Sequence, residues 1–274
     1  MDDARPLTSA GLSVPNEPTR DVCTNSRRSE HRRHIGRQHR CMHEALLLQK
    51  TYDDGFARLP SVDPAQRERV LRELERLVDG RPADGAESPM HLEAFARVVP
   101  LLEALLATDP VGIRPRDFAQ LAYLAQFPGV AQPIALQLAF GPAAGEANRR
   151  KIMRVFDAAR SRGVAMDDYV AKMRADGAMP HDALVRLFLG QERRPPSVDR
   201  VRLGIALLRR AASMVPAEYR PPLLCAIAWL HWSRGQRAVA QIYLAEASHI
   251  EPSDVLAYSL MEHFGSRMPS WLSS

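Results

Sequence analysis

The range Leu223–Pro252 reads LLCAIAWLHWSRGQRAVAQIYLAEASHIEP, and it carries the strongest signal of the fold in this chain. Apolar residues fill its first half almost without a break, and its second half carries apolar residues at three- and four-residue spacing. That spacing is typical of an α-helix, and Gly235 stands between the two halves. The stretch therefore predicts two helices joined by a tight turn. The residues expected where these helices meet alternate in size: Ala240, Leu244 and Ala247.

This spacing resembles a tetratricopeptide-type helical hairpin, in which small residues let the second helix lie close to the first. Counted from the glycine, a small residue stands at +5, a large one at +9, a small one at +12 and a proline at +17. The first helix departs from that pattern, because Ala228 replaces the usual glycine and His231 stands where an aromatic residue is common. Since one hairpin cannot bury its own apolar face, we expect it to stack on the amphipathic stretches Val201–Val215 and Val255–Phe264.

Two tryptophans stand three positions apart in the first helix of the hairpin, and they have two interpretations. One is that Trp229 and Trp232, with the nearby Arg234, form a surface that anchors a protein partner. The other is that both indole rings pack in the core. We favour the core, because aromatic residues at helical spacing are usually buried.

The C-terminal block also resembles a known family, the actinobacterial proteins of domain of unknown function 4192. The residues that carry the resemblance are the Pro-rich lead-in Val215–Pro222, the Ala-Trp-x-x-Trp-x-x-Gly helix Ala228–Gly235 and the closing Pro-x-Trp tail Pro269–Trp271. An upstream helix at Asp117–Gln126 is also similar, so the resemblance covers roughly residues 100–272. It implies a helical C-terminal fold and an actinobacterial source. It implies no reaction, since the family has no assigned activity.

The chain upstream of residue 190 also shows helical periodicity. Asp63 and Pro64 are typical of a helix start, and apolar residues follow at helical spacing. Further stretches of this kind are 89–106, 117–126, 133–140, 144–162, 166–175 and 180–189. Pro100 should kink or split the first of these, and the short turns between the others predict antiparallel neighbours.

The segment Gly190–Pro196, GQERRPP, is the most linker-like part of the body. We therefore expect an antiparallel helical bundle over residues 44–190 and a separate tetratricopeptide-like subdomain over residues 197–274. The predicted helical stack has no capping helix, so a homodimer through its open end is one expectation.

Composition agrees with an all-α protein. Of the 274 residues, 46% are hydrophobic and only 6% aromatic, and the apolar residues are mainly Ala, Leu and Val. No window reaches the ~18 apolar residues of a membrane span, and the N-terminus lacks the apolar segment of a secretion signal. The three cysteines form neither a disulfide framework nor a zinc pattern. We therefore expect a cytoplasmic protein with no membrane partner.

Residues 1–43 read as a disordered basic arm, with eight arginines against five acidic residues. Six of these arginines are candidates for contacting the phosphates of a nucleic acid: Arg27, Arg28, Arg32, Arg33, Arg37 and Arg40. We favour a solvated tail, because no aromatic residue is interleaved to stack a base. A second alternative is that translation begins at Met42. Cys23, His31, His34, Cys41 and His43 match no zinc spacing.

The sequence carries no phosphate loop, dinucleotide motif, hydrolase elbow or zincin motif. Asp53–Asp54 and Asp167–Asp168 are typical of helix caps, and Cys225 falls on the apolar side of its helix. We therefore predict no catalytic, cofactor-binding or metal-binding residues. The best-supported function is protein–protein interaction or scaffolding, with an unknown protein partner. A nucleic-acid-associated protein is the alternative, and an enzyme with no recognisable motif is a weaker one.

Overall fold

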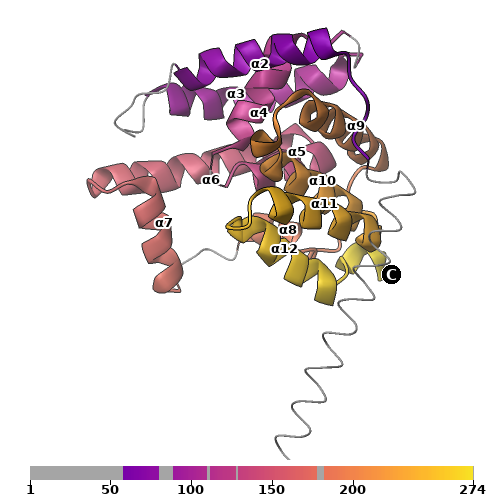
Figure 1. The fold of residues 1–274 in the computed structure, drawn as a ribbon. Helices are drawn as coiled ribbons and strands as arrows, with labels where there is room; N and C mark the ends of the chain where they lie inside the picture. The colour runs from indigo at the N-terminus through magenta and orange to yellow at the C-terminus, as the bar shows by residue number, and fades with distance from the viewer. Residues whose placement is uncertain (1–57, 80–88, 110–111, 128, 178–181, 274) are drawn as a thin grey trace, which may run out of the picture. The chain divides into compact units, whose positions relative to one another are not determined.

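The computed structural model describes residues 58–79, 89–109, 112–127, 129–177 and 182–273. All of the described residues belong to one compact unit, Leu48–Ser274. Within the described residues every regular element is a helix and none is a strand (Figure 1). The prediction of an all-α fold is therefore confirmed.

The helices of the described residues follow one another with short connections. The α-helices are α2 (Pro64–Asp79), α3 (Pro89–Ala107), α4 (Pro115–Ala125), α5 (Ala131–Phe140), α6 (Pro142–Ser161), α7 (Met166–Ala175), α8 (Ala183–Phe188), α9 (Val198–Met214), α10 (Pro221–Ser233), α11 (Arg237–Ile250) and α12 (Val255–Ser266). Two short 3-10 helices are η1 (Ala217–Tyr219) and η2 (Ser270–Leu272).

Local signals explain where several of these helices begin and end. The Asp63 carboxylate accepts a hydrogen bond from the backbone N–H of Ala65 at 3.1 Å, and Pro64 is the first residue of α2 as predicted. The predicted glycine stops are also present, because Gly163 and Gly177 follow α6 and α7 in left-handed conformations with φ +66° and +64°. Pro100 does not split its helix, because α3 runs through it from Pro89 to Ala107.

The core is built around α5 and α10, which are buried on nearly every side. Eight of the ten residues of α5 and eleven of the thirteen residues of α10 are buried. Helix α10 packs against α5, α9, α11 and α12, which surround it in Figure 1. A helix that is apolar all round belongs in the interior, and this composition places both helices at the centre of the molecule.

The hairpin predicted from Leu223–Pro252 is present as α10 and α11. Gly235 lies in the turn with φ +79°, a left-handed conformation that glycine adopts without steric strain. Ala240, Leu244 and Ala247 are fully buried where α11 meets α10, and α9 and α12 flank the pair. The helical hairpin and its two neighbours are therefore confirmed, while its likeness to a tetratricopeptide repeat stays a prediction.

The structure does not divide at the predicted linker Gly190–Pro196. The carbonyl of Gly190 accepts a hydrogen bond from the N–H of Ser270 at 2.7 Å, and the N–H of Ser197 donates to the carbonyl of Ala139 at 2.9 Å. One hydrophobic core includes residues from both sides, from Val70 to Trp271. The separation into residues 44–190 and 197–274 was therefore wrong, because the segment is fastened to the C-terminal tail, where the Ser270 hydroxyl also donates to the carbonyl of Glu192 at 2.8 Å.

Candidate functional site: a cleft between α3 and α4

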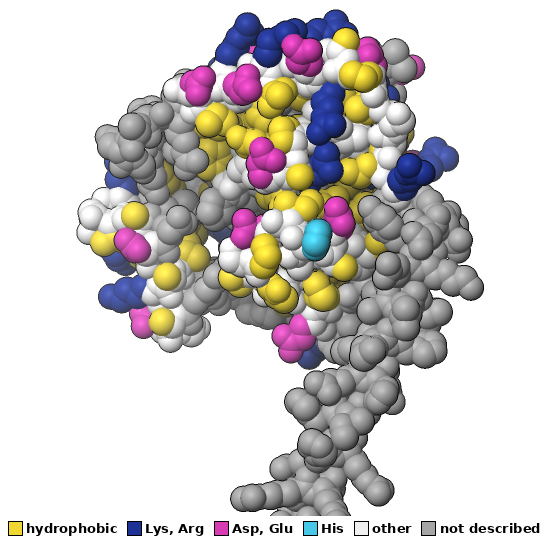
Figure 2. Space-filling model, viewed as in Figure 1, with side chains coloured by type: hydrophobic (Ala, Val, Ile, Leu, Met, Phe, Trp, Pro, Cys, Tyr) yellow, Lys and Arg dark blue, Asp and Glu magenta, His cyan; other side chains and the backbone are white. Residues whose placement is uncertain are grey.

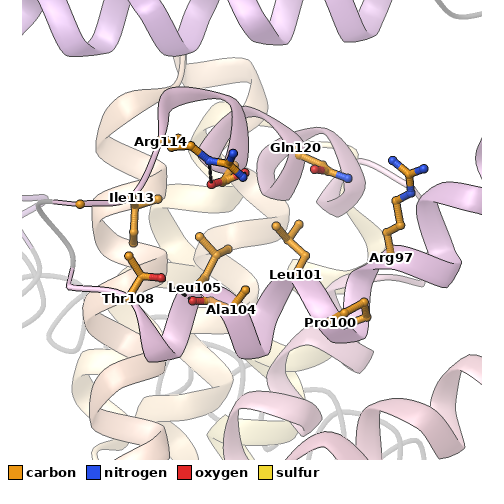
Figure 3. A pocket seen from close by; sticks show the side chains of 11 residues that line it. Arg97, Pro100, Leu101, Ala104, Leu105, Thr108, Ile113, Arg114 and Gln120 are labelled. Atoms are coloured by element: carbon orange, nitrogen blue, oxygen red, sulfur yellow. Dashed lines mark hydrogen bonds and ion pairs between the residues drawn. The ribbon is translucent and has the colours of Figure 1, made fainter.

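An apolar hollow with polar groups around it lies between α3 and α4 and has a volume of about 480 Å³ (Figure 3). Its lining residues come from the second half of α3, the following turn and the first half of α4: Arg97, Pro100, Leu101, Ala104, Leu105, Thr108, Gly112, Ile113, Arg114, Asp117 and Gln120. In Figure 2, hydrophobic side chains gather over the region of α2 to α4, among acidic and basic ones.

The floor of the cleft is apolar. Leu101 and Leu105 lie one turn apart on α3 and point toward α4, and Ile113 closes one end (Figure 3). Leu105 and Ile113 are buried, whereas Leu101 is only partly covered and Ala104 is exposed. Positions 101, 104 and 105 share one face of α3, so the helix presents an apolar surface to the cleft beside its core-facing residues.

Beside Ile113, the cleft is bordered by an ion pair. Arg114 immediately precedes α4, and its guanidinium donates from Nε and Nη2 to the two carboxylate oxygens of Asp117, each at 2.9 Å. The arginine side chain is 77% exposed and the aspartate 18%. The hydrogen bonds from Arg114 to Asp117 also raise the pKa of Arg114. The bidentate ion pair of Arg114 and Asp117 therefore presents two planar polar groups at the edge of the apolar floor.

The opposite end of the cleft carries Arg97 and Gln120, which face each other from α3 and α4 in Figure 3. The Gln120 amide has no hydrogen-bond partner among the described residues. Near Ile113, the Thr108 hydroxyl donates to the carbonyl of Ala104 at 2.7 Å (Figure 3). The cleft thus combines an apolar floor with convergent polar groups at both ends, the arrangement typical of binding sites.

The chemistry of the lining suits binding. Its side chains are aliphatic, amide, hydroxyl, guanidinium and one carboxylate that is already paired. Across the described ranges no group of three or more His, Cys, Asp or Glu could hold a metal ion. None of the described helices has the length and apolar character needed to cross a membrane.

The tryptophans singled out in the sequence lie in the core. Trp229 and Trp232 are both fully buried, and their indole N–H groups donate to the carbonyls of Phe188 at 2.8 Å and Arg267 at 3.0 Å. Core packing, the interpretation that we favoured, is confirmed. The partner-anchor interpretation is corrected, because neither ring reaches the surface; only Arg234 is exposed.

Other residues noted in the sequence take no part in the cleft. Cys225 is buried, and burial, with the negative charge of Asp254 at 3.8 Å from its Sγ, raises the pKa of its thiol well above the ordinary value. It therefore behaves as a small apolar residue, as predicted. Asp167 and Asp168 lie in the first turn of α7. The six arginines Arg27, Arg28, Arg32, Arg33, Arg37 and Arg40, the Cys and His residues of the arm and Asp53–Asp54 lie outside the described residues.

The α3–α4 cleft was not predicted from the sequence. The sequence does place apolar residues at positions 101, 105 and 113, but their spacing is the same as that of residues that pack in the core. Only the exposure of Leu101 and Ala104 distinguishes this stripe, and exposure depends on which neighbours cover it.

Comparisons with known proteins were made for the whole chain. No family model matches it, and neither a curated protein nor a solved structure does. The resemblance to the domain of unknown function 4192 family therefore stays a prediction.

Proposed function

We propose that this protein is a protein–protein interaction module that binds a partner segment in the cleft between α3 and α4. The observation that carries the proposal is the combination of an apolar floor of Leu101, Leu105 and Ile113 with polar groups at both ends. Such a cleft suits one or two apolar side chains of a partner, flanked by hydrogen-bonding groups.

The cleft is built on rigid elements, which favours binding. Helix α3 is fastened to α5 and α9, because the Gln137 amide donates to the carbonyl of Val99 at 2.9 Å and Arg200 pairs with Glu103 at 2.7 Å. A preformed site loses little conformational entropy when a partner binds. In this proposal α9 to α12 act as a tetratricopeptide-like scaffold that supports the binding helices.

The experiment fills the cleft with a side chain. Ala104 is exposed and lines the cleft, so Ala104→Arg should block it without disturbing the core. Ala206 is exposed on α9 and does not line the cleft, so Ala206→Arg is the matched control. Both variants and the wild type are used as bait in cells of the source organism, and partners are identified by mass spectrometry.

We expect a partner that is recovered with the wild type and with Ala206→Arg and is lost with Ala104→Arg. With the purified partner, the dissociation constant should rise at least tenfold for Ala104→Arg, about 1.4 kcal/mol of binding free energy. Equal recovery with both folded variants would show that the cleft does not bind the partner. Removal of every recovered partner by nuclease would instead favour the nucleic-acid alternative.

A further inference from the structure

A second, smaller cavity of about 190 Å³ lies where the segment preceding α2 meets α10 and α11. Its residues are Arg58, Leu59, Arg220, Leu224, Ile242, Tyr243 and Glu246. Three of these side chains are aliphatic, and two carry guanidinium groups against one carboxylate. The cavity shares no residue with the α3–α4 cleft.

The two arginines of this cavity are placed differently. Arg220 is held in position, because its Nε and Nη2 donate to the carbonyl of Val215 at 3.2 and 3.1 Å. Arg58 is exposed and forms no ion pair with a described residue. A fixed guanidinium and an exposed one at the same cavity suit an oxyanion, since each presents several N–H donors to its oxygens.

Further positive charge lies next to the cavity. The Nη2 of Arg209 donates to the carbonyl of Arg58, and its Nε is buried without a hydrogen-bond partner among the described residues. The ring of His231 stacks on Tyr243, with centroids 5.4 Å apart and an angle of 16° between the planes. Arg209 and Arg234 lie close enough to act on His231 electrostatically. Two arginines therefore line the cavity and two more lie nearby, and Glu246 is the only carboxylate among the described residues that line it.

The pKa of His231 reflects the positive charge in this region. Burial lowers the pKa of His231, and the charges of Arg209 and Arg234 lower it further, while the hydrogen bond with Gln236 acts in the opposite direction. The ring is thus neutral near pH 7, and the positive charge around it belongs to the arginines.

We propose that this cavity is an oxyanion site that takes the phosphate group of a small ligand, held by the guanidinium groups of Arg58 and Arg220. Arg209 and Arg234, which act electrostatically on His231, add a longer-range attraction for the anion. A cavity of about 190 Å³ accommodates a phosphate group with a small substituent. The excess of arginine over carboxylate favours a divalent anion such as phosphate over a monovalent carboxylate.

The test titrates the full chain with inorganic phosphate at constant ionic strength and follows the ring signals of His231 by NMR. Three variants accompany the wild type. Arg58→Gln removes the exposed guanidinium, Glu246→Gln removes the opposing charge, and Arg202→Gln is the control, since Arg202 is an exposed arginine on α9 paired with Asp199 at 3.5 Å. The ring signals of His263 report whether each variant is folded.

We expect the His231 signals to shift saturably with phosphate and the pKa of His231 to rise, because a bound anion stabilises the imidazolium form. Arg58→Gln should weaken binding about tenfold, since a charge-assisted hydrogen bond is lost. Glu246→Gln should strengthen binding, and Arg202→Gln should leave it unchanged. Acetate should bind more weakly than phosphate.

Two results would overturn the proposal. One is an unsaturable response of equal size in the wild type and Arg58→Gln, which is the behaviour of a salt that is merely excluded from the protein surface. The other is equal binding of acetate and phosphate, which would exclude selection of a divalent anion. Either result would leave the proposed function of the α3–α4 cleft untouched.

Discussion

Gly190 is a residue at which a single methyl group should strongly destabilise the fold. Its φ of +69° lies in the left-handed region, and a Cβ there would lie 2.6 Å from Cη2 of Trp232 and 2.9 Å from Cα of Pro269. Both neighbours belong to the aromatic core, where Trp232 stacks on Phe264 with ring centroids 4.6 Å apart. The glycine therefore lets the segment after α8 lie directly against α10 and the C-terminal tail.

We expect Gly190→Ala to lower the free energy of unfolding by about 2–5 kcal/mol, the sum of left-handed strain and overpacking. Urea denaturation measures the loss. The matched control is Gly163→Ala, because Gly163 has nearly the same φ of +66° but nothing within 4 Å of its Cβ position. The control should lose only about 1–2 kcal/mol. Equal losses in the two variants would contradict the proposed close packing.

His231 and His263 make the stability of the fold depend on pH. Burial lowers the pKa of both rings, and nearby arginines lower it further, although each ring also has a hydrogen bond that acts in the opposite direction. For His263 that bond goes to the carbonyl of Leu189 at 3.1 Å. As pH falls through the ordinary value of 6.5, the unfolded chain therefore binds protons before the folded chain does.

We expect the free energy of unfolding to be fully retained above about pH 7 and to fall as pH drops through 6.5, levelling off below the folded-state pKa values. Urea denaturation between pH 7.5 and 5.5 measures the slope, in a window above the range where carboxylates titrate. The double variant His231→Gln/His263→Gln should give a flatter profile. An unchanged slope in that variant would assign the pH dependence to other groups.

At the scale of elements, a polar network fastens α3, α5 and α9 together. Arg200 forms a bidentate pair with Glu103 at 2.7 and 3.0 Å and also donates to the carbonyl of Gln137 at 3.1 Å. The Gln137 amide donates to Glu103 at 2.9 Å. Burial raises the pKa of Glu103, but these hydrogen bonds and the charge of Arg200 outweigh it and hold the pKa below its ordinary value. The carboxylate therefore stays ionised at neutral pH.

We expect Glu103→Gln to lower the free energy of unfolding by about 1–2 kcal/mol, because a charge-assisted pair between partly buried groups is lost. The control is Glu68→Gln, whose pair with Arg72 is 2.9 Å long but largely exposed, and it should change stability by less than about 0.5 kcal/mol. A double-mutant cycle with Arg200→Gln measures the coupling energy. A coupling near zero would show that the network does not fasten α3 to α9.

Helix boundaries were largely predictable at this scale, because they depend on residues within a turn of each end. Asp63 with Pro64, Gly163 and Gly177 act locally, and the bounds of α2, α6 and α7 lie where they indicated. Pro100 does not split α3, and the reason is not local. Its helix continues on both sides, with Val98 and Leu102 buried in the surrounding core, so tertiary packing offsets the missing backbone donor.

At the scale of the whole molecule, the described residues do not divide into two parts at Gly190–Pro196. Helix α10 buries its apolar surface partly against α5, and the Trp229 ring stacks on Phe188 with centroids 5.5 Å apart. A fragment of residues 197–274 would expose these surfaces to water.

We therefore expect the fragment 197–274 to show no cooperative unfolding transition, whereas the unit Leu48–Ser274 should unfold in one transition. Circular dichroism during thermal and urea denaturation distinguishes the two cases. A fragment that unfolds cooperatively would restore the division into two subdomains.

The sequence by itself determined the helical fold class, the positions of most helices and the hairpin at Gly235, because periodicity, caps, glycines and prolines act on neighbours within a few residues. That the linker-like segment lies against the core and that a cleft opens between α3 and α4 could be seen in the tertiary structure alone. Each of these depends on which faces of helices distant in the chain meet. An apolar stripe looks the same in the sequence whether a neighbouring helix covers it or leaves it open to a partner.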